Sequence, residues 1–167
     1  MSAPKMRGWV NAMSDAVKAR AASGNRDVIG VLVHRDADTA DPVGRLAEEL
    51  NGQLAGLPVD ARAIVPVQET EAWWLAYPAA LAAIRSWWAK AVHDPSGDTE
   101  RIAGPKELLQ RQTRRTTGDS RGQYVESDSR AIAAQIVLLP GWRGSWRGQA
   151  PPSLERALQA VESVGDS

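Results

Sequence analysis

The stretch Val28-Ile29-Gly30-Val31-Leu32-Val33, followed by His34-Arg35-Asp36-Ala37-Asp38, decides the fold class of this chain. Its first six residues form a short apolar run that is rich in β-branched side chains. An apolar run without polar alternation is typical of a strand buried on both faces, as in parallel sheets. The run therefore predicts an α/β protein, and ligands of open α/β sheets bind just beyond the carboxyl ends of the strands.

Helical patterns lie on both sides of this strand. Residues 5–22 carry an apolar stripe at helical spacing. Asp41-Pro42 predicts the start of a helix over 41–55, with aspartate as N-cap and proline in the first turn. Residues 61–67 predict a second strand, adjacent and parallel to the first, although Pro66 weakens its end.

The rest of the chain is predicted to be helical. Thr70 is the expected N-cap of the next helix, and Pro78 is expected to break that helix in two. The later helices are predicted over residues 78–91, 105–115, 129–139 and 153–164. The expected fold is a small, mostly parallel sheet flanked by helices, in a single domain over 1–167 whose C-terminal part, 101–167, is helical.

Composition excludes several classes of protein. The chain has 167 residues, which fits one domain, and 43% of them are hydrophobic. It has no cysteine, which excludes disulfide frameworks, zinc ribbons, iron–sulfur clusters and thiol catalysis. No apolar run approaches the roughly 20 residues that span a bilayer, and the N-terminus lacks the apolar core of a signal peptide. We therefore expect a cytoplasmic protein without a membrane segment.

Charge is balanced overall but uneven along the chain. Twenty basic residues match twenty acidic ones, which excludes a globally basic nucleic-acid-binding protein. Residues 27–100 carry five basic and twelve acidic residues, whereas residues 101–156 carry ten basic and five acidic ones. This division suits a site that holds a cation and faces a polyanion. The alternative is that both regions are solvated surface.

Acidic residues follow both predicted strands. Asp36 and Asp38 end the first strand, and capping does not require them because Asp41 is the better cap. Glu69 and Glu71 follow the second strand and fall nearby if the strands are parallel neighbours. Carboxylates at close range repel one another unless a cation lies among them, and two carboxylates suit magnesium. The alternative is that the aspartates solvate a loop and that Glu71 favourably occupies a helix N-terminus.

Basic and aromatic residues in the second half suit nucleic acid. Four arginines could hold phosphate, namely Arg111, Arg114, Arg115 and Arg121. Trp142 and Trp146 lie in an Arg/Gly-rich loop over 141–148, where they either stack on bases or anchor the loop.

Four blocks, in this order, resemble an uncharacterised bacterial family with a Toprim-like fold, related to the nuclease domain of overcoming-lysogenization-defect proteins. The blocks are Arg35-Asp36-Ala37-Asp38, Thr70-Glu71-Ala72-Trp73-Trp74-Leu75, Pro105-Lys106-Glu107-Leu108-Leu109 and Pro152-Ser153-Leu154. The resemblance covers about residues 5–164. It implies that Asp36, Asp38 and Glu71 bind magnesium or manganese, and it places Glu71 and Lys106 among the catalytic residues. Apart from the resemblance, we expect Arg35, Arg111, Arg114 and Arg115 to contact nucleic acid.

The resemblance implies a magnesium-dependent phosphodiesterase or nuclease that acts on nucleic acid in bacterial defence or DNA processing. The chain departs from the Toprim pattern in one respect, because residues 1–26 contain no glutamate that could serve as the upstream catalytic acid. Either the first strand is missing or the protein does not use that residue. The alternative function is therefore a non-catalytic Toprim-like module that binds a partner protein or nucleic acid.

Overall fold

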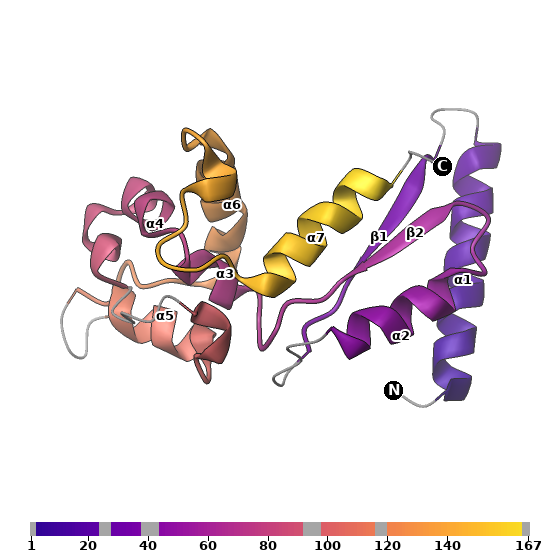
Figure 1. The fold of residues 1–167 in the computed structure, drawn as a ribbon, viewed down its shortest axis with the longest axis horizontal. Coiled ribbons are helices and arrows are strands. Elements are labelled where there is room, and N and C mark those ends of the chain that lie inside the picture. Colours follow the sequence, from indigo (N-terminus) through magenta and orange to yellow (C-terminus); the bar gives the residue numbers. More distant parts are fainter. Residues whose placement is uncertain (1–2, 24–27, 38–43, 92–97, 116–119, 165–167) are drawn as a thin grey trace. The chain divides into compact units, whose positions relative to one another are not determined.

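The computed structural model describes residues 3–23, 28–37, 44–91, 98–115 and 120–164 (Figure 1). The chain forms two compact units. The first unit comprises residues 1–35, 43–65 and 156–167, and the second comprises residues 36–42 and 66–155. The first unit contains α1 (Ala3–Ala22), β1 (Gly30–His34), α2 (Arg45–Leu54), β2 (Asp60–Ile64) and most of α7 (Pro152–Ser163). The second contains α3 (Glu71–Leu75), α4 (Pro78–Ile84), α5 (Pro105–Thr113), α6 (Ser129–Leu138) and four short 3-10 helices (Ser86–Ala91, Thr99–Arg101, Glu126–Asp128 and Trp142–Gly144).

The two strands form a parallel pair, as the sequence predicts. Their register runs from Gly30 opposite Asp60 to His34 opposite Ile64, and α2 connects them along the chain. Pairing continues one residue beyond β1, where the backbone N–H of Arg35 donates to the carbonyl of Ile64 at 3.0 Å. The chain is therefore a mixed α/β protein, and after β2 its described residues form helices and loops without a further strand.

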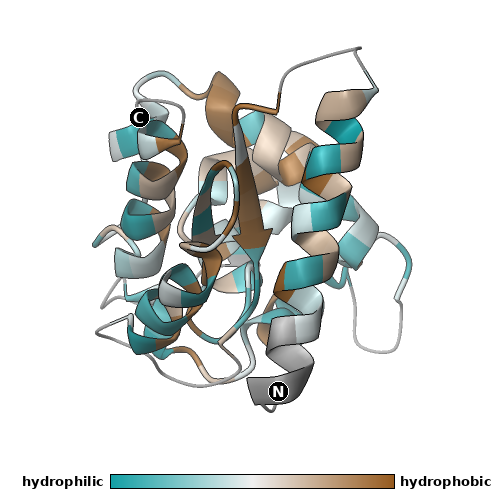
Figure 2. Cartoon of the chain, turned by 90° about the vertical axis from the view of Figure 1, so that its right-hand side faces the viewer, coloured by the Kyte–Doolittle hydropathy of each residue, from teal (hydrophilic) through white to brown (hydrophobic). Residues whose placement is uncertain are grey.

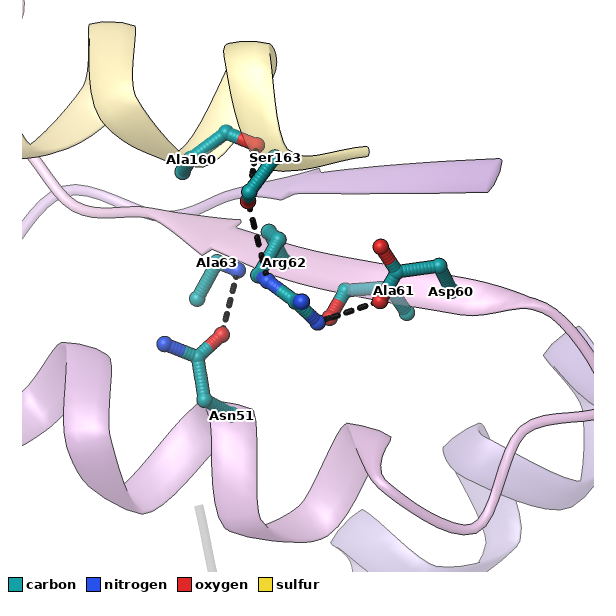
Figure 3. Close-up of polar contacts among 7 residues, drawn as sticks. All are labelled: Asn51, Asp60, Ala61, Arg62, Ala63, Ala160 and Ser163. Atoms are coloured by element: carbon teal, nitrogen blue, oxygen red, sulfur yellow. Dashed lines mark hydrogen bonds and ion pairs between the residues drawn. The ribbon is translucent and has the colours of Figure 1, made fainter. Parts of the chain in front are cut away.

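Helices lie on both sides of β2 within the first unit (Figure 3). On one side, the side chain of Asn51 in α2 accepts a hydrogen bond from the backbone N–H of Ala63 at 2.7 Å. On the other side, Nε of Arg62 donates to Oγ of Ser163 in α7 at 3.2 Å. Gly30 permits close approach at this second face, because a Cβ there would lie 2.1 Å from Cγ1 of Val164.

Burial of β1 differs from the prediction of a strand covered on both faces. Val33 is buried, with 8% of its surface exposed, but Leu32 is 44% exposed. Successive side chains of a strand point to opposite faces, so the two residues report on different faces of the sheet. On the face of Leu32, α7 binds Arg62 of the neighbouring strand and leaves Leu32 partly open. Figure 2 shows a predominantly hydrophobic strand beside the long helix α1, whose turns alternate between hydrophilic and hydrophobic.

Some element boundaries also differ from the sequence prediction. Helix α2 begins at Arg45 with Gly44 as N-cap (φ 74°), whereas the expected start at Asp41-Pro42 lies outside the described residues. Strand β2 ends at Ile64 rather than at residue 67. Pro66 explains the early end, because proline has no N–H with which to continue a ladder.

The helices of the second unit surround a core of completely buried side chains. Pro78 separates α3 from α4, and α5 begins at Pro105, both as predicted. Trp88 and Tyr124 are fully buried and meet edge-to-face, with ring centroids 6.4 Å apart. The indole N–H of Trp88 donates to the carbonyl of Gly122 at 2.9 Å. In the described part of the chain, no helix has the length and apolar character needed to cross a bilayer.

A buried serine joins four segments of the second unit. Oγ of Ser153, in the first turn of α7, accepts hydrogen bonds from the indole N–H of Trp73 at 2.8 Å and from the backbone N–H of Val67 at 3.2 Å. The same hydroxyl donates to the carboxylate of Glu100. That carboxylate also accepts the backbone N–H of Ser153 at 2.8 Å, so Glu100 satisfies an open donor at the start of α7.

We expect the substitution Ser153→Ala to lower the free energy of unfolding by about 3 kcal/mol, because it leaves several buried polar groups without a partner. Ser23→Ala is the matched control, since the Ser23 hydroxyl is exposed and donates to the carbonyl of Arg20 at the end of the same helix. Thermal melts followed by circular dichroism measure both effects. Equal, small changes in the two variants would contradict the structural role of Ser153.

Candidate functional site

The segments that follow the two strands lie side by side in the second unit. The hydroxyl of Thr70 donates to Oδ1 of Asp36 at 3.2 Å, and the backbone N–H of Ala37 donates to the carbonyl of Pro66 at 3.0 Å. Thr70 occupies the N-cap position of α3 but makes no side-chain capping bond, contrary to the sequence prediction. Its hydroxyl is directed to Asp36 instead, so Thr70 links the two acidic segments.

Glu71 is held by a tyrosine from a distant part of the chain. Only 8% of its surface is exposed, and its Oε1 accepts a hydrogen bond from the hydroxyl of Tyr124 at 2.7 Å. The same hydroxyl lies 2.8 Å from Oγ of Ser129. Burial, together with the charge of Glu71, raises the pKa of Tyr124, which keeps this hydroxyl protonated and able to donate. The contact fixes the position of the Glu71 carboxylate.

Further carboxylates come together around Glu69. Its Oε2 accepts the backbone N–H of Lys106, in the first turn of α5, at 3.1 Å. Burial raises the pKa of Glu69, and repulsion from Glu71 and Glu107 raises it further, while the Lys106 N–H opposes the shift. Negative charge from two segments of the chain therefore accumulates at this point.

The side chain of Lys106 forms an ion pair with Glu126. This hydrogen bond raises the pKa of Lys106 and lowers the pKa of Glu126. The charges of Glu71 and Glu69 act on Lys106 in the same direction, with smaller effect. Lys106 is thus a charged neighbour of the carboxylates, while its ammonium group is bound to a different partner.

The predicted metal ligands are only partly described. Asp36 and Glu71 both lie in the second unit, whereas Asp38 lies outside the described residues. Among the residues that the structure describes, no three histidine, aspartate or glutamate side chains are arranged to hold a metal ion. The donor set is nevertheless of the right kind, because carboxylate oxygens are the protein ligands that magnesium prefers.

A separate cavity in the second unit, which we call the arginine cavity, is lined by arginine side chains. Its volume is about 320 Å³, and its lining residues are Arg85, Trp87, Arg115, Arg121 and Gly122. The guanidinium carbons of Arg85 and Arg115 lie 5.8 and 5.2 Å from the ring centroid of Trp87. Nε of Arg85 is buried and has no hydrogen-bond partner among the described residues. Three guanidinium groups at one cavity suit an anion with several oxygens.

The predicted nucleic-acid contacts are distributed unevenly. Arg115 lines this cavity, Arg114 donates to the side chain of Gln123 at 2.7 Å, and Arg111 is exposed in the last turn of α5. Arg35 follows β1 in the first unit. Sequence reasoning missed Arg85, because it lies outside the basic region. The available signal was an arginine two residues before a pair of adjacent tryptophans, within a segment over residues 72–93 that contains no acidic residue.

A further cavity in the second unit has its charged groups satisfied by the protein itself. This cavity of about 510 Å³ is bordered by Gln68, which has a positive φ of 63°, and by Asp98, Glu100 and Arg101. Glu100 is bound by Ser153, and Asp98 pairs with Arg101 at 2.8 Å. We therefore assign these acids to the structure of the loop rather than to the site.

We expect Glu69→Gln to raise the melting temperature at pH 7, because the amide keeps the acceptor for Lys106 and removes a carboxylate whose folded pKa is raised. A raised folded pKa means that the wild type loses stability as the pH rises through that pKa. The gain of the variant should therefore disappear below pH 4, where the carboxyl group is protonated. Glu49→Gln, on the exposed surface of α2, is the control. A lower melting temperature for Glu69→Gln at pH 7 would contradict the repulsion of Glu69 by Glu71 and Glu107.

No protein-family model matches this chain, and neither a curated protein nor a solved structure matches it. The Toprim-like resemblance therefore depends on the four sequence blocks, and the function has to be argued from the chain's own residues.

Proposed function

We propose that this protein is a Toprim-like, metal-dependent phosphodiesterase that acts on nucleic acid. In this proposal Asp36, Asp38 and Glu71 hold magnesium or manganese. The observation that carries the proposal is the hydrogen bond from Thr70 to Asp36, which keeps the Asp36 segment beside the segment that contains Glu69 and Glu71. The sequence predicts these same two segments as the metal site.

Electrostatics favour a cation at this place. The raised pKa of Glu69 reflects burial and repulsion from Glu71 and Glu107, and a divalent cation would relieve this repulsion. A bound metal would polarise a phosphate oxygen and lower the pKa of a water molecule, which is the chemistry that phosphodiester hydrolysis requires. Tyr124 would keep the Glu71 carboxylate in one position, and Lys106 would add positive charge nearby.

The arginine cavity supports a polyanionic substrate. Arg85, Arg115 and Arg121 line it, and the described residues that line it include no acidic side chain. Guanidinium groups bind phosphate oxygens through paired hydrogen bonds. Such contacts neutralise backbone phosphates regardless of base sequence, so affinity that depends on them falls steeply with salt.

A second candidate function is a non-catalytic module that binds nucleic acid or a partner protein. It is favoured by one observation: protein groups already engage both predicted catalytic side chains. Glu71 is bound by Tyr124, and Lys106 is paired with Glu126. In this alternative the carboxylates are structural, and the arginine cavity is the functional part.

Thermal melts with and without millimolar magnesium or manganese test the metal site. At a concentration one hundred times the dissociation constant, the metal should stabilise the wild type by about 2.7 kcal/mol. Asp36→Asn combined with Asp38→Asn should abolish this gain. The matched control combines Asp15→Asn with Glu49→Gln, two exposed positions outside the site, and should retain the gain. If the metal does not shift the melting temperature of the wild type, or shifts that of the site variant equally, these residues do not form a metal site.

Cleavage of labelled DNA and RNA separates the two candidate functions. Hydrolysis that requires magnesium or manganese, stops with chelator and is lost in the Asp36/Asp38 variant supports the phosphodiesterase. Binding without hydrolysis under all these conditions supports the non-catalytic module instead.

Replacing Arg85 tests the phosphate contacts. We expect Arg85→Gln to weaken nucleic-acid binding for all sequences and to reduce the slope of log affinity against log salt by about 1. The control is Arg20→Gln, which removes an exposed arginine near the end of α1. Filter binding at salt concentrations between about 50 and 300 mM gives these slopes, because affinity that depends on phosphate contacts falls steeply over such a range. An unchanged slope in Arg85→Gln would show that the arginine cavity does not contact the phosphate backbone of the nucleic acid.

A further inference from the structure

Two guanidinium groups at the arginine cavity have no counter-charge from the protein. In the described part of the chain, the side chains of Arg85 and Arg115 form neither a hydrogen bond nor an ion pair. Arg115 is exposed, whereas Arg85 is half-buried. A positive charge that is partly removed from water costs free energy unless an opposite charge lies beside it. The cavity therefore favours an anion, to which both side chains can donate.

Trp87 holds both of these guanidinium groups at the cavity. Their central carbons lie 5.8 Å (Arg85) and 5.2 Å (Arg115) from the centroid of its ring. The ring itself is fixed, because its indole N–H donates to the carbonyl of Thr113 at the end of α5, at 3.0 Å. Side chains that are ordered in advance lose less entropy when a ligand binds. The donors are thus preorganised for an anion.

Gly122 lets the backbone pass close to these groups. Its φ is 71°, and a Cβ there would lie 3.0 Å from Cζ2 of Trp87 and 3.6 Å from Nη1 of Arg85. A larger residue would therefore press on the ring that orders the two arginines. The carbonyl of Gly122 also accepts the indole N–H of the buried Trp88, so this side of the cavity is tied to the core of the second unit.

The number of guanidinium groups narrows the class of anion. Arg121 also lines the cavity, so three such groups reach it. A phosphodiester inside a strand has a single negative charge and two unbridged oxygens. A phosphomonoester has three such oxygens and about 1.5 to 2 negative charges at pH 7. Because each guanidinium group can bind two oxygens through paired hydrogen bonds, three of them match the monoester better than the diester.

The size of the cavity agrees with such a group. Its volume of about 320 Å³ lies at the lower end of the range for small-molecule sites, about 300 to 1,000 Å³. A phosphate and the sugar that carries it fit within this range. Nucleic acids carry a phosphomonoester only at the ends of strands. Hydrolysis of a phosphodiester creates one, because the water oxygen joins the phosphorus and a proton passes to the sugar oxygen that is released.

We infer that the arginine cavity binds the terminal phosphomonoester of a nucleic-acid strand, with the guanidinium groups of Arg85 and Arg115 donating to its oxygens. This inference rests on the proposed function, because a nucleic-acid substrate supplies the phosphate. It adds that the protein recognises the end of a strand. A strand with a terminal phosphate should therefore bind more tightly than the same strand without one.

Fluorescence anisotropy tests the inference on the full chain. The probes are short single strands of one sequence that carry a 5′-phosphate, a 3′-phosphate or no terminal phosphate, each compared with the fluorophore at the opposite end. A chelator keeps the strands intact during the measurement. The wild type should bind one of the phosphorylated strands about tenfold more tightly than the unphosphorylated strand, and the two phosphorylated strands show which end is recognised.

Replacing Arg115 separates the terminal phosphate from overall charge. Arg115→Gln should reduce the preference for the phosphorylated strand about fivefold, and it should melt like the wild type because Arg115 is exposed. The matched control is Arg130→Gln, which removes an exposed arginine in the first turn of α6 and should keep the tenfold preference. Equal affinity of the wild type for all three strands, or an unchanged preference in Arg115→Gln, would overturn the inference. Tighter binding of a phosphoserine peptide than of either phosphorylated strand would overturn it in favour of a protein partner.

Cleavage of the same strands with magnesium or manganese distinguishes failure of this inference from failure of the proposed function. A preference for the terminal phosphate without metal-dependent cleavage would leave the inference in place and refute the proposed hydrolysis. Metal-dependent cleavage without this preference would do the reverse. Loss of salt dependence in Arg85→Gln follows for terminal and internal phosphates alike, so the comparison of strands is the deciding measurement.

Discussion

The hydroxyl of Ser153 is the contact on which the second unit depends most. It accepts from Trp73 and Val67 and donates to Glu100, so one buried oxygen connects the loop after β2 with α3, a 3-10 helix and the start of α7. Trp73 follows Glu71 by two residues, in the same five-residue helix. A helix this short has little intrinsic stability, and tertiary contacts must hold it in place. The position of Glu71 therefore depends on the contacts of Trp73 as well as on Tyr124.

The same helix shows how structure and chemistry compete for polar groups. Thr70 could have capped α3, but its hydroxyl binds Asp36. Glu71 could have remained solvated at the helix start, but it is buried and takes the hydroxyl of Tyr124. Burial of Glu71 places a carboxylate in a region of low solvation, where repulsion from neighbouring carboxylates is strongest. A protein that only needed a stable helix would gain from a neutral side chain in place of Glu71.

Local signals explain what the sequence predicted correctly. The parallel pair of strands follows from one apolar run, a second run and a helix between them, and the starts of α4 and α5 follow from Pro78 and Pro105. Long-range contacts explain what it did not predict. Tyr124 and Glu71 are 53 residues apart in the chain, and no local pattern signals their contact. The exposure of Leu32 depends on where α7 lies over the sheet. Arg85 lies outside the basic region of the sequence, and only folding places it beside Arg115 and Arg121.

The hydrogen bond between Asn51 and the backbone of Ala63 affects how the sheet can associate. A strand at the edge of a sheet offers open N–H groups to any extended chain that comes near, and this is a common route to aggregation. In β2 the N–H of Ala63 points away from β1, and a side chain of the preceding helix already accepts its hydrogen bond. Another strand could add there only by displacing Asn51. A single amide on α2 thus protects the middle of β2, a task that many sheets give to prolines or lysines on the edge strand itself.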